Sequence, residues 1–358
     1  GVLSSSDVDF PGTVSNVNYD VGSVDPNLAF AVPGADGQVC FRNNDRAELD
    51  LVADSVASIA ADSWTVPTGS DSPVRVLDTR DGSGPIEPES ESCFAVDAAP
   101  GAVAVVNLTP VQASSRGFGV LVPEGVPVLP DVSNVNYDVG TRDPNVAIAR
   151  VASSGRVCFV NGPTASVHLV VDHIGTLADE SFTPPTDSGL QRRAFDTRDG
   201  GSPLLYRQGR CFEVAGEPGD LALVNVVGIS RRGSGALLLA DSASTGFFAS
   251  SANFAPGSLD PNLAVAEIND AGSVCVRVVT GDLDVRVDVI ADHLGTVRGS
   301  AATVSGPERI LDTRFEEVTE DAMTLVGDWE PAVEISCRAR PSGPTDGGGS
   351  TWNRTVVA

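Results

Sequence analysis

The eight residues SNVNYDVG occur at Ser15–Gly22 and again at Ser133–Gly140, and a looser version, SANFAPG, occupies Ser251–Gly257. These segments begin at intervals of 118 residues. Other short motifs recur with nearly the same spacing. They are DTR at Asp78–Arg80, Asp196–Arg198 and Asp312–Arg314, and DPN at Asp25–Asn27, Asp143–Asn145 and Asp260–Asn262. A repeat of this length organises the chain into structural units, and here it predicts three of them.

The phase of the motifs shows that one unit is split. Two complete units are contiguous, a first intact unit at residues 70–183 and a second intact unit at residues 188–303. The second half of the split unit opens the chain at 1–66, and its first half closes the chain at 304–358. We therefore expect the N- and C-terminal segments to pair and complete this third unit, because unpaired edge strands invite aggregation.

The two ends of the chain interrupt the split unit at a position that, in the intact units, is a polar loop between two apolar stretches. This pattern indicates a hairpin whose tip tolerates a chain break. We thus expect the last strand, near Val356, to lie beside the first strand, near Val2. If this pairing occurs between molecules, the same sequence forms a head-to-tail filament.

The residues between the motifs favour an all-β fold. The chain contains 37 Gly and 24 Pro among segments rich in Val, Thr and Ser. In DVRVDVIAD, Val285, Val287 and Val289 alternate with polar residues, which is the period of a strand. Short strands between regularly spaced turns predict three sandwich-like or barrel-like β units.

Composition excludes several partners. The chain has 48 acidic residues and 23 basic residues, and its net charge is −25. All 23 basic residues are Arg. This charge repels nucleic acid and anionic lipid, whose binding requires a cationic surface. The longest apolar runs are far shorter than the roughly 18 residues needed to span a membrane, so no membrane insertion is expected. We interpret the chain as a mature, exported, soluble protein.

Six cysteines occupy repeated positions, which favours disulfides and an oxidising compartment. Pairing within units predicts Cys93–Cys158, Cys211–Cys275 and, across the two ends of the chain, Cys40–Cys337. A rival scheme joins Cys40–Cys93, Cys158–Cys211 and Cys275–Cys337. The sequence leaves both schemes open.

The ordered motifs LDTRDG, VVNLT, SNVNY, DPN, GxVCF and VDHIG resemble a repeat of about 110–120 residues found in large exported surface proteins of actinobacteria. The resemblance covers nearly the whole chain. It implies an extracellular accessory or surface role without catalysis, and it carries no defined activity.

The DTR motifs have a structural and a ligand-binding interpretation. Arg80, Arg198 and Arg314 present planar guanidinium groups that grip carboxylates or backbone carbonyls. Asp78, Asp196 and Asp312 cap turns in the structural interpretation. In the ligand-binding interpretation, the three arginines bind a sugar acid. Asp78 with Asp81, and Asp196 with Asp199, offer oxygen ligands for calcium, although their spacing matches no complete calcium loop.

The Asn-rich motifs have two interpretations as well. As turn formers, Asn27, Asn145 and Asn262 hydrogen-bond the local backbone. As a shallow glycan site, the SNVNY motifs supply amides and a ring for sugar stacking from Asn16, Asn18, Tyr19, Asn134, Asn136 and Tyr137.

We expect no enzyme activity and no cofactor. The histidines are His168, His173 and His293, and no G-x-S-x-G elbow accompanies them. The sequence therefore predicts a non-catalytic cell-surface module for structure or adhesion, whose partners are surface glycans or copies of itself. The alternatives are a multivalent lectin-like module and a subunit of an extracellular filament.

Overall fold

The computed structural model describes residues 2–5, 14–35, 37, 39–43, 48–68, 73–126, 132–186, 189–243, 249–314 and 356–357. The described residues form an all-β fold, as the sequence predicts, and their helical structure is limited to two 3-10 turns, η1 (Ala61–Ser63) and η2 (Asp179–Ser181). Within these residues, no helix has the length and apolar character required to cross a membrane.

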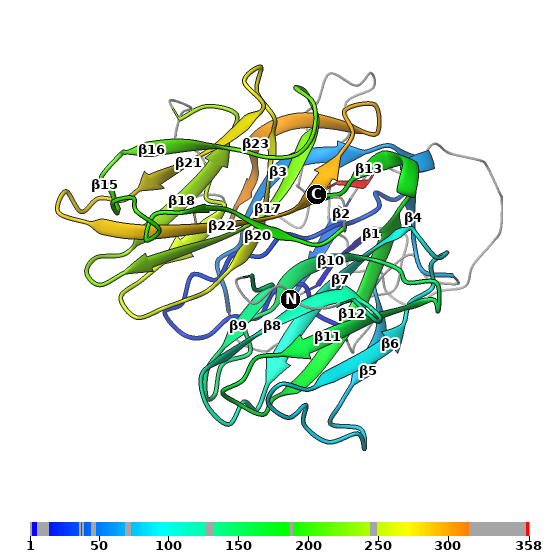
Figure 1. Ribbon diagram of the computed structural model, residues 1–358. Helices are drawn as coiled ribbons and strands as arrows, with labels where there is room; N and C mark the ends of the chain where they lie inside the picture. Colours follow the sequence, from blue (N-terminus) through cyan, green and yellow to red (C-terminus); the bar gives the residue numbers. More distant parts are fainter. Residues whose placement is uncertain are drawn as a thin grey trace.

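The first intact unit consists of two antiparallel sheets, drawn in cyan to green in Figure 1. One sheet has the order β10-β7-β12, with β4 and β5 both pairing with β12, and the other has the order β6-β11-β8-β9. Their bounds are β4 Trp64–Thr65, β5 Val74–Asp78, β6 Glu91–Ala95, β7 Val103–Val111, β8 Gly117–Pro123, β9 Val135–Tyr137, β10 Asn145–Arg150, β11 Arg156–Asn161 and β12 His168–Leu177.

The second intact unit repeats this arrangement. Its sheets have the orders β20-β17-β22, with β13, β14 and β15 pairing with β22, and β16-β21-β18-β19. Their bounds are β13 Phe182–Thr183, β14 Arg192–Asp196, β15 Leu204–Leu205, β16 Gly209–Glu213, β17 Leu221–Ser230, β18 Gly235–Ala240, β19 Ala252–Phe254, β20 Asn262–Glu267, β21 Ser273–Val279 and β22 Arg286–Val297.

The split unit is assembled from both ends of the chain. Strand β1 (Val2–Ser5) pairs with β2 (Val39–Arg42), and β3 (Val52–Ile59) lies between β23 (Ala302–Asp312) and β24 (Val356–Val357). An N-terminal strand is thus flanked by two C-terminal strands within one chain, which confirms that the terminal segments pair. The register of β24 matches that of the intact units, because Val356 opposes Ile59 as Val103 opposes Leu177.

The predicted hairpin between the last and first strands is wrong in its pairing. The equivalent strands β7 and β8 follow one another along the chain but belong to opposite sheets of the sandwich. Strand β7 is buried on both faces, so it lies between two cores, whereas β8 pairs with β11 and β9. Accordingly, β24 pairs with β3 and β1 pairs with β2.

Each intact unit encloses its own core between its two sheets. In the first, Ala104, Val106 and Leu108 of β7 pack with Leu121 of β8 and Phe159 of β11. The second has an equivalent core. Burial of this apolar surface, at roughly 25 cal/mol per Å², is the main stabilising contribution to each sandwich.

A further core joins the three units. Two other side chains of β7, Val103 and Val105, point to the opposite face of the strand from Ala104 and Val106 and belong to this central core. The split unit contributes Phe30 and Ile59, and the second intact unit contributes Leu223. The sheets that face the centre are therefore buried on both sides, which explains why β7 and the second half of β22 do not alternate between buried and exposed residues.

Each unit also extends the sheet of the next one. Trp64 of β4 pairs with Leu177, Phe182 of β13 pairs with Val297, and Ala302 of β23 pairs with Ile59. Matching backbone bonds precede these strands, from Ala178 N to Ser63 O at 3.1 Å, from Arg298 N to Ser181 O at 2.9 Å and from Ala60 N to Ala301 O at 2.8 Å. The third contact returns to the split unit, so the units form a closed ring with approximate threefold symmetry.

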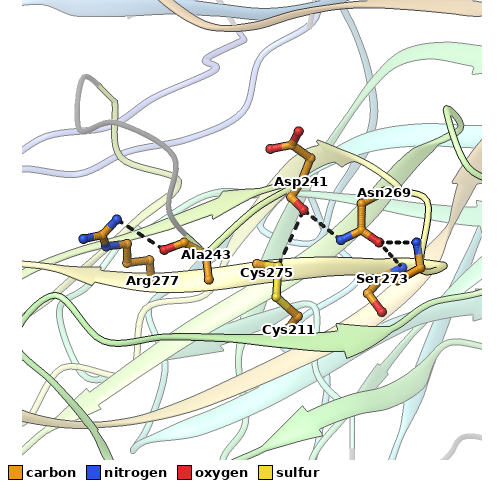
Figure 2. Close-up of a disulfide and its surroundings, with 8 residues drawn as sticks. Cys211, Asp241, Ala243, Asn269, Ser273, Cys275 and Arg277 are labelled. Atoms are coloured by element: carbon orange, nitrogen blue, oxygen red, sulfur yellow. Dashed lines mark hydrogen bonds between the residues drawn. A yellow bond between two sulfur atoms is a disulfide. The ribbon is translucent and has the colours of Figure 1, made fainter.

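Two disulfides, Cys93–Cys158 and Cys211–Cys275, join directly opposed residues of neighbouring strands. They are the pairs expected within the intact units, and they exclude a bond between Cys158 and Cys211. Figure 2 shows the second, beside an Asn269 side chain that donates a 2.8 Å bond to the carbonyl of Asp241. Cys337 lies outside the described residues, so Cys40–Cys337 remains a prediction.

Candidate functional site

The DTR motif is the centre of an ion-pair network that recurs in all three units. In the second intact unit, Arg193 pairs with Asp196 at 2.8 Å and with Asp292 of β22. The equivalent groups are Arg75 with Asp78 and Asp172, and Arg309 with Asp312 and Asp54. Asp172 and Asp292 are almost completely buried.

A β-bulge makes this network geometrically feasible. The arginine lies three positions before the DTR aspartate, so a regular strand would place the two side chains on opposite faces. Strand β14 skips one residue between Arg193 and Phe195 in its register with β22, and β5 and β23 skip the equivalent residue. The extra residue brings arginine and aspartate to one side. Sequence reasoning missed these arginines, although the pattern R-x-x-D-T-R recurs in all three copies.

The remaining DTR residues bind adjoining parts of the chain and the motif itself. The Thr79 and Thr197 hydroxyls accept bonds from the amides of Leu169 at 3.0 Å and Val289 at 2.9 Å. Thr313 accepts one from Leu51 at 2.8 Å. Each DTR arginine folds back onto the aspartate two residues earlier, for example Arg198 Nε to Asp196 Oδ1 at 2.8 Å.

These contacts determine the charge state of the DTR aspartates. The Arg80 and Arg198 guanidinium groups lower the pKa of Asp78 and Asp196, and Arg314 lowers the pKa of Asp312 to about 2. The carboxylates are ionised and already surrounded by positive charge, which disfavours the calcium sites considered for Asp78 with Asp81 and for Asp196 with Asp199. Arg80, Arg198 and Arg314 remain half-exposed.

The second Asn of SNVNY links neighbouring units. Asn18 donates to the carbonyl oxygen of Arg142 at 2.8 Å, and Asn136 donates to that of Leu259 at 2.6 Å. Asn253 donates to that of Val24 at 2.8 Å, which closes the cycle. Asn18 and Asn136, two of the four amides considered for glycan contact, therefore use their Nδ2 donors to bind the backbone of the next unit.

The other SNVNY side chains bind within their own unit, except that Asn134 also donates from Nδ2 to Oε1 of Gln191, in the second intact unit, at 3.0 Å. The Oδ1 atoms of Asn16 and Asn134 accept bonds from the amides of Leu3 and Leu121, both at 2.7 Å. Tyr19 donates to Asn43 at 2.7 Å, and the buried hydroxyl of Tyr137 donates to Asn161. Burial raises the pKa of Tyr137 to about 12. The two tyrosine hydroxyls thus have internal partners.

The DPN asparagines do more than form turns. Asn145 donates to the backbone of Asn134 at 2.7 Å and to Oδ1 of Asn225, in the second intact unit, at 2.8 Å. Asn27 likewise contacts Asn107 of the first intact unit at 3.1 Å. Asn262 donates to the Ser251 carbonyl at 2.5 Å. The partners Asn107 and Asn225 belong to the VVN motif, which sequence reasoning used only for alignment.

The DPN aspartates form a group of like charges. Burial and the carboxylates of Asp260, Asp25 and Asp20 raise the pKa of Asp143 to about 6. Burial and Asp25 raise that of Asp260. Three equivalent residues of a ring meet only near its axis, so this acidic cluster marks the pseudo-threefold axis.

Among the described residues, the contacts of the three histidines are with threonine hydroxyls and backbone groups. Burial lowers the pKa of His173, and it lowers that of His293 to about 4, so both imidazoles are neutral at pH 7. His293 contacts Thr296 at 3.0 Å, and His168 contacts Thr79 at 2.9 Å. These contacts indicate structural roles.

No family model and no curated protein matches the chain. Among solved structures, the vicilin of Solanum lycopersicum (tomato) is 9% identical, with 69% of this chain and 86% of that chain covered and a TM-score of 0.18. The coconut allergen cocosin is 12% identical, with 73% and 88% covered and a TM-score of 0.17. Likeness at this level carries no argument, so the chain is assigned to no family.

Proposed function

We propose that this chain is a non-catalytic structural module of an extracellular or cell-surface protein, in which three β units close into a rigid ring. One observation carries the proposal. The second asparagines of SNVNY, Asn18 and Asn136, and the equivalent Asn253 of SANFAPG bind the next unit in a complete cycle. Selection for ring closure explains their repetition without a ligand.

The extracellular location is supported by the two disulfides. Disulfides persist in oxidising compartments and are rare in the cytosol. The resemblance to repeats of exported actinobacterial surface proteins agrees with this location. A rigid ring with three similar outer faces is suited to adhesion or assembly at a surface, because weak contacts gain from multivalency.

Substitution of Asn136 separates this proposal from a lectin that uses the SNVNY amides. Asn136→Ala removes a bond between units, so we expect a loss of roughly 0.5–1.5 kcal/mol in the free energy of unfolding. Thermal unfolding measures this loss, and a glycan array compares binding by the same samples. Val139→Ala, at an exposed position in the turn that follows β9, is the matched control and should leave both unchanged.

The opposite pattern would overturn the structural role. If the array detects saturable glycan binding that Asn136→Ala abolishes without a change in melting temperature, the amide serves a ligand. Light scattering coupled to size exclusion addresses the filament alternative. A ring closed within the chain is expected to elute with the mass of one chain, whereas head-to-tail assembly produces larger, concentration-dependent species.

A further inference from the structure

A hollow of about 430 Å³ opens at the edge of the second intact unit, where its two sheets separate. It is lined by β14, by the DTRDGGS loop that follows, and by Arg210 of β16. Its volume lies in the range of small-molecule sites and exceeds that needed for a simple ion. The DTR network forms one wall.

The loop keeps the hollow open by means of two consecutive glycines. Gly200 has a φ of +80°, a backbone conformation that side chains rarely adopt. A Cβ on Gly201 would lie 2.7 Å from the carbonyl oxygen of Thr197, so any larger residue would move the loop. The path of the backbone therefore depends on the absence of side chains here.

The base of the hollow is rigid. Phe195 stacks on Phe212 with ring centroids 5.3 Å apart, and Thr197 is buried and bonded to β22. Arg193 and Asp196 are held by their ion pairs. The rim is formed by the exposed residues Asp199, Ser202 and Arg210.

Charge balance singles out Arg210. Within the network, Arg193 and Arg198 offset Asp196 and Asp292, and Asp199 lies in the field of Arg198. Among the residues that the structure describes, no side-chain hydrogen bond or ion pair occupies the Arg210 guanidinium. The positively charged guanidinium of Arg210 therefore lies at the rim of the hollow, although the chain as a whole has a net charge of −25.

The first intact unit provides an internal comparison. The segment from the DTR aspartate to the next cysteine is 16 residues long in both intact units. In the first it carries Glu87, Glu89 and Glu91, with Ser92 at the position of Arg210. In the second it carries Arg207 and Arg210 and no acidic residue after Asp199. The same backbone scaffold therefore carries opposite charge at this edge.

We propose that the hollow of the second intact unit binds a carboxylate-bearing sugar residue of the uronic acid type. The planar guanidinium of Arg210 matches a carboxylate bidentately. Asp199, Ser202 and the backbone of Gly200 and Gly201 offer acceptors and donors to ring hydroxyls. This site goes beyond the structural role proposed above and does not rest on it, since its lining residues take no part in the contacts between units described above.

Titration of the intact chain with glucuronate and galacturonate, followed by NMR, tests the site. Glucose and galactose serve as neutral counterparts, and acetate serves as a carboxylate without a ring. We expect saturable binding of a uronate, weaker by about tenfold or more for the neutral sugar, because a charge-assisted bond is lost. Arg210→Ser, which introduces the residue of the first intact unit, should weaken uronate binding by a similar factor.

Arg231→Ser is the matched control, because it removes the same charge from an exposed position in the β17–β18 loop, outside the hollow. It should leave binding unchanged, and neither variant should alter the melting temperature. Uronate binding that survives Arg210→Ser, equal affinity for acidic and neutral sugars, acetate binding as tight as uronate binding, or no saturable binding would each overturn the proposal.

Discussion

Two sets of aspartates, each repeated in all three units, have opposite electrostatic surroundings. Asp78, Asp196 and Asp312 of the DTR motifs contact two arginines each, and their pKa values are lowered. Asp143 and Asp260 of the DPN motifs face other carboxylates, and their pKa values are raised. Both sets occupy polar turns in the sequence, so residue type alone does not distinguish them.

The difference follows from distance to the symmetry axis. A residue far from the axis meets side chains of its own unit, so a repeated arginine can accompany a repeated aspartate. A residue close to the axis meets its own copies, and repetition then multiplies like charges. In a ring made by internal duplication, the axis is therefore where electrostatic repulsion accumulates, and it should respond differently to substitution.

The largest effect is expected when a buried DTR partner is removed. Arg193→Met leaves Asp292, which is 1% exposed, without its arginine. Breaking a buried pair from one side costs about 3–5 kcal/mol, because an uncompensated charge remains inside. Urea unfolding at pH 8 measures the loss. Burial already raises the pKa of Asp292 to about 6, so Asp292 can take up a proton and the loss should be smaller at pH 5.

Arg198→Gln is the control for this prediction, since its guanidinium is half-exposed and its pairing is local. An exposed pair of this kind contributes roughly 0–1 kcal/mol. Equal losses in the two variants would show that the buried and exposed arginines of the network are equivalent, contrary to the geometry.

The split unit should be equivalent to the two intact units, and Cys40 of the split unit allows a test of this equivalence. Cys40 lies on β2 at the position of Cys158 on β11, so equivalence predicts a disulfide with Cys337. Its loss in Cys337→Ser should cost roughly 2–5 kcal/mol. Cys40→Ser should cost the same, and the double variant no more than either single one. Peptide mapping without reduction that recovers Cys40 linked to another cysteine would refute the equivalence.

A smaller effect of opposite sign is expected at the axis. Asp143→Asn removes one of the clustered charges, so it should stabilise the protein at pH 8 and raise the melting temperature by a few degrees. The folded pKa of Asp143, about 6, lies above the ordinary 3.8. The charge of Asp143 therefore destabilises the fold above pH 6, and this penalty disappears as protonation proceeds below it. The gain should fade between pH 7 and pH 4.

Thermal unfolding of both proteins across that range checks this prediction. Asp81→Asn is the matched control, because Asp81 is exposed beside a DTR arginine and away from the axis. A gain for Asp143→Asn that persists at pH 4 would mean that its charge is not the cause.

The smallest effect is expected at the exposed end of a DTR pair. Arg314→Gln releases Asp312, whose pKa is about 2 with the arginine present. Because this pKa is depressed, the stabilisation exists above the ordinary value of 3.8 and is lost as the pH falls toward 2. The two proteins should therefore differ slightly at pH 6 and not at pH 2. NMR titration of the Asp312 carboxyl should show its pKa rising in the variant.

Much of the fold could be predicted from sequence because the motifs repeat. Three DTR and three DPN motifs located the units, and their phase showed that residues 1–66 and 304–358 belong together. The placement of β7 and β8 in opposite sheets could not be predicted from the loop between them, since a short polar loop usually marks a hairpin. The apolar run Val103–Val106 at the start of β7 was the available signal, because a run without polar alternation indicates a strand covered on both faces.

The candidate site was harder to predict than the fold. SNVNY and DTR were correctly recognised as repeated polar features, yet a sequence does not show which unit a side chain faces. Asn136 reaches a carbonyl 123 positions away, and Arg193 reaches Asp196 only because of a bulge. The hollow beside Arg210 depends on a difference between copies, which a search for shared motifs overlooks.

Strands β4, β13 and the start of β23 each pair with a strand of the next unit, and this pairing limits how such chains evolve. A solenoid can gain or lose repeats, because each repeat contacts only its neighbours and the ends are open. Here β23 pairs with β3 of the split unit and closes the ring. Insertion or deletion of one copy would therefore leave one sheet without the strand that the preceding unit supplies, and it would leave a gap or a clash at the centre. Gene duplication can multiply whole triplets, but it cannot add a fourth member to this one.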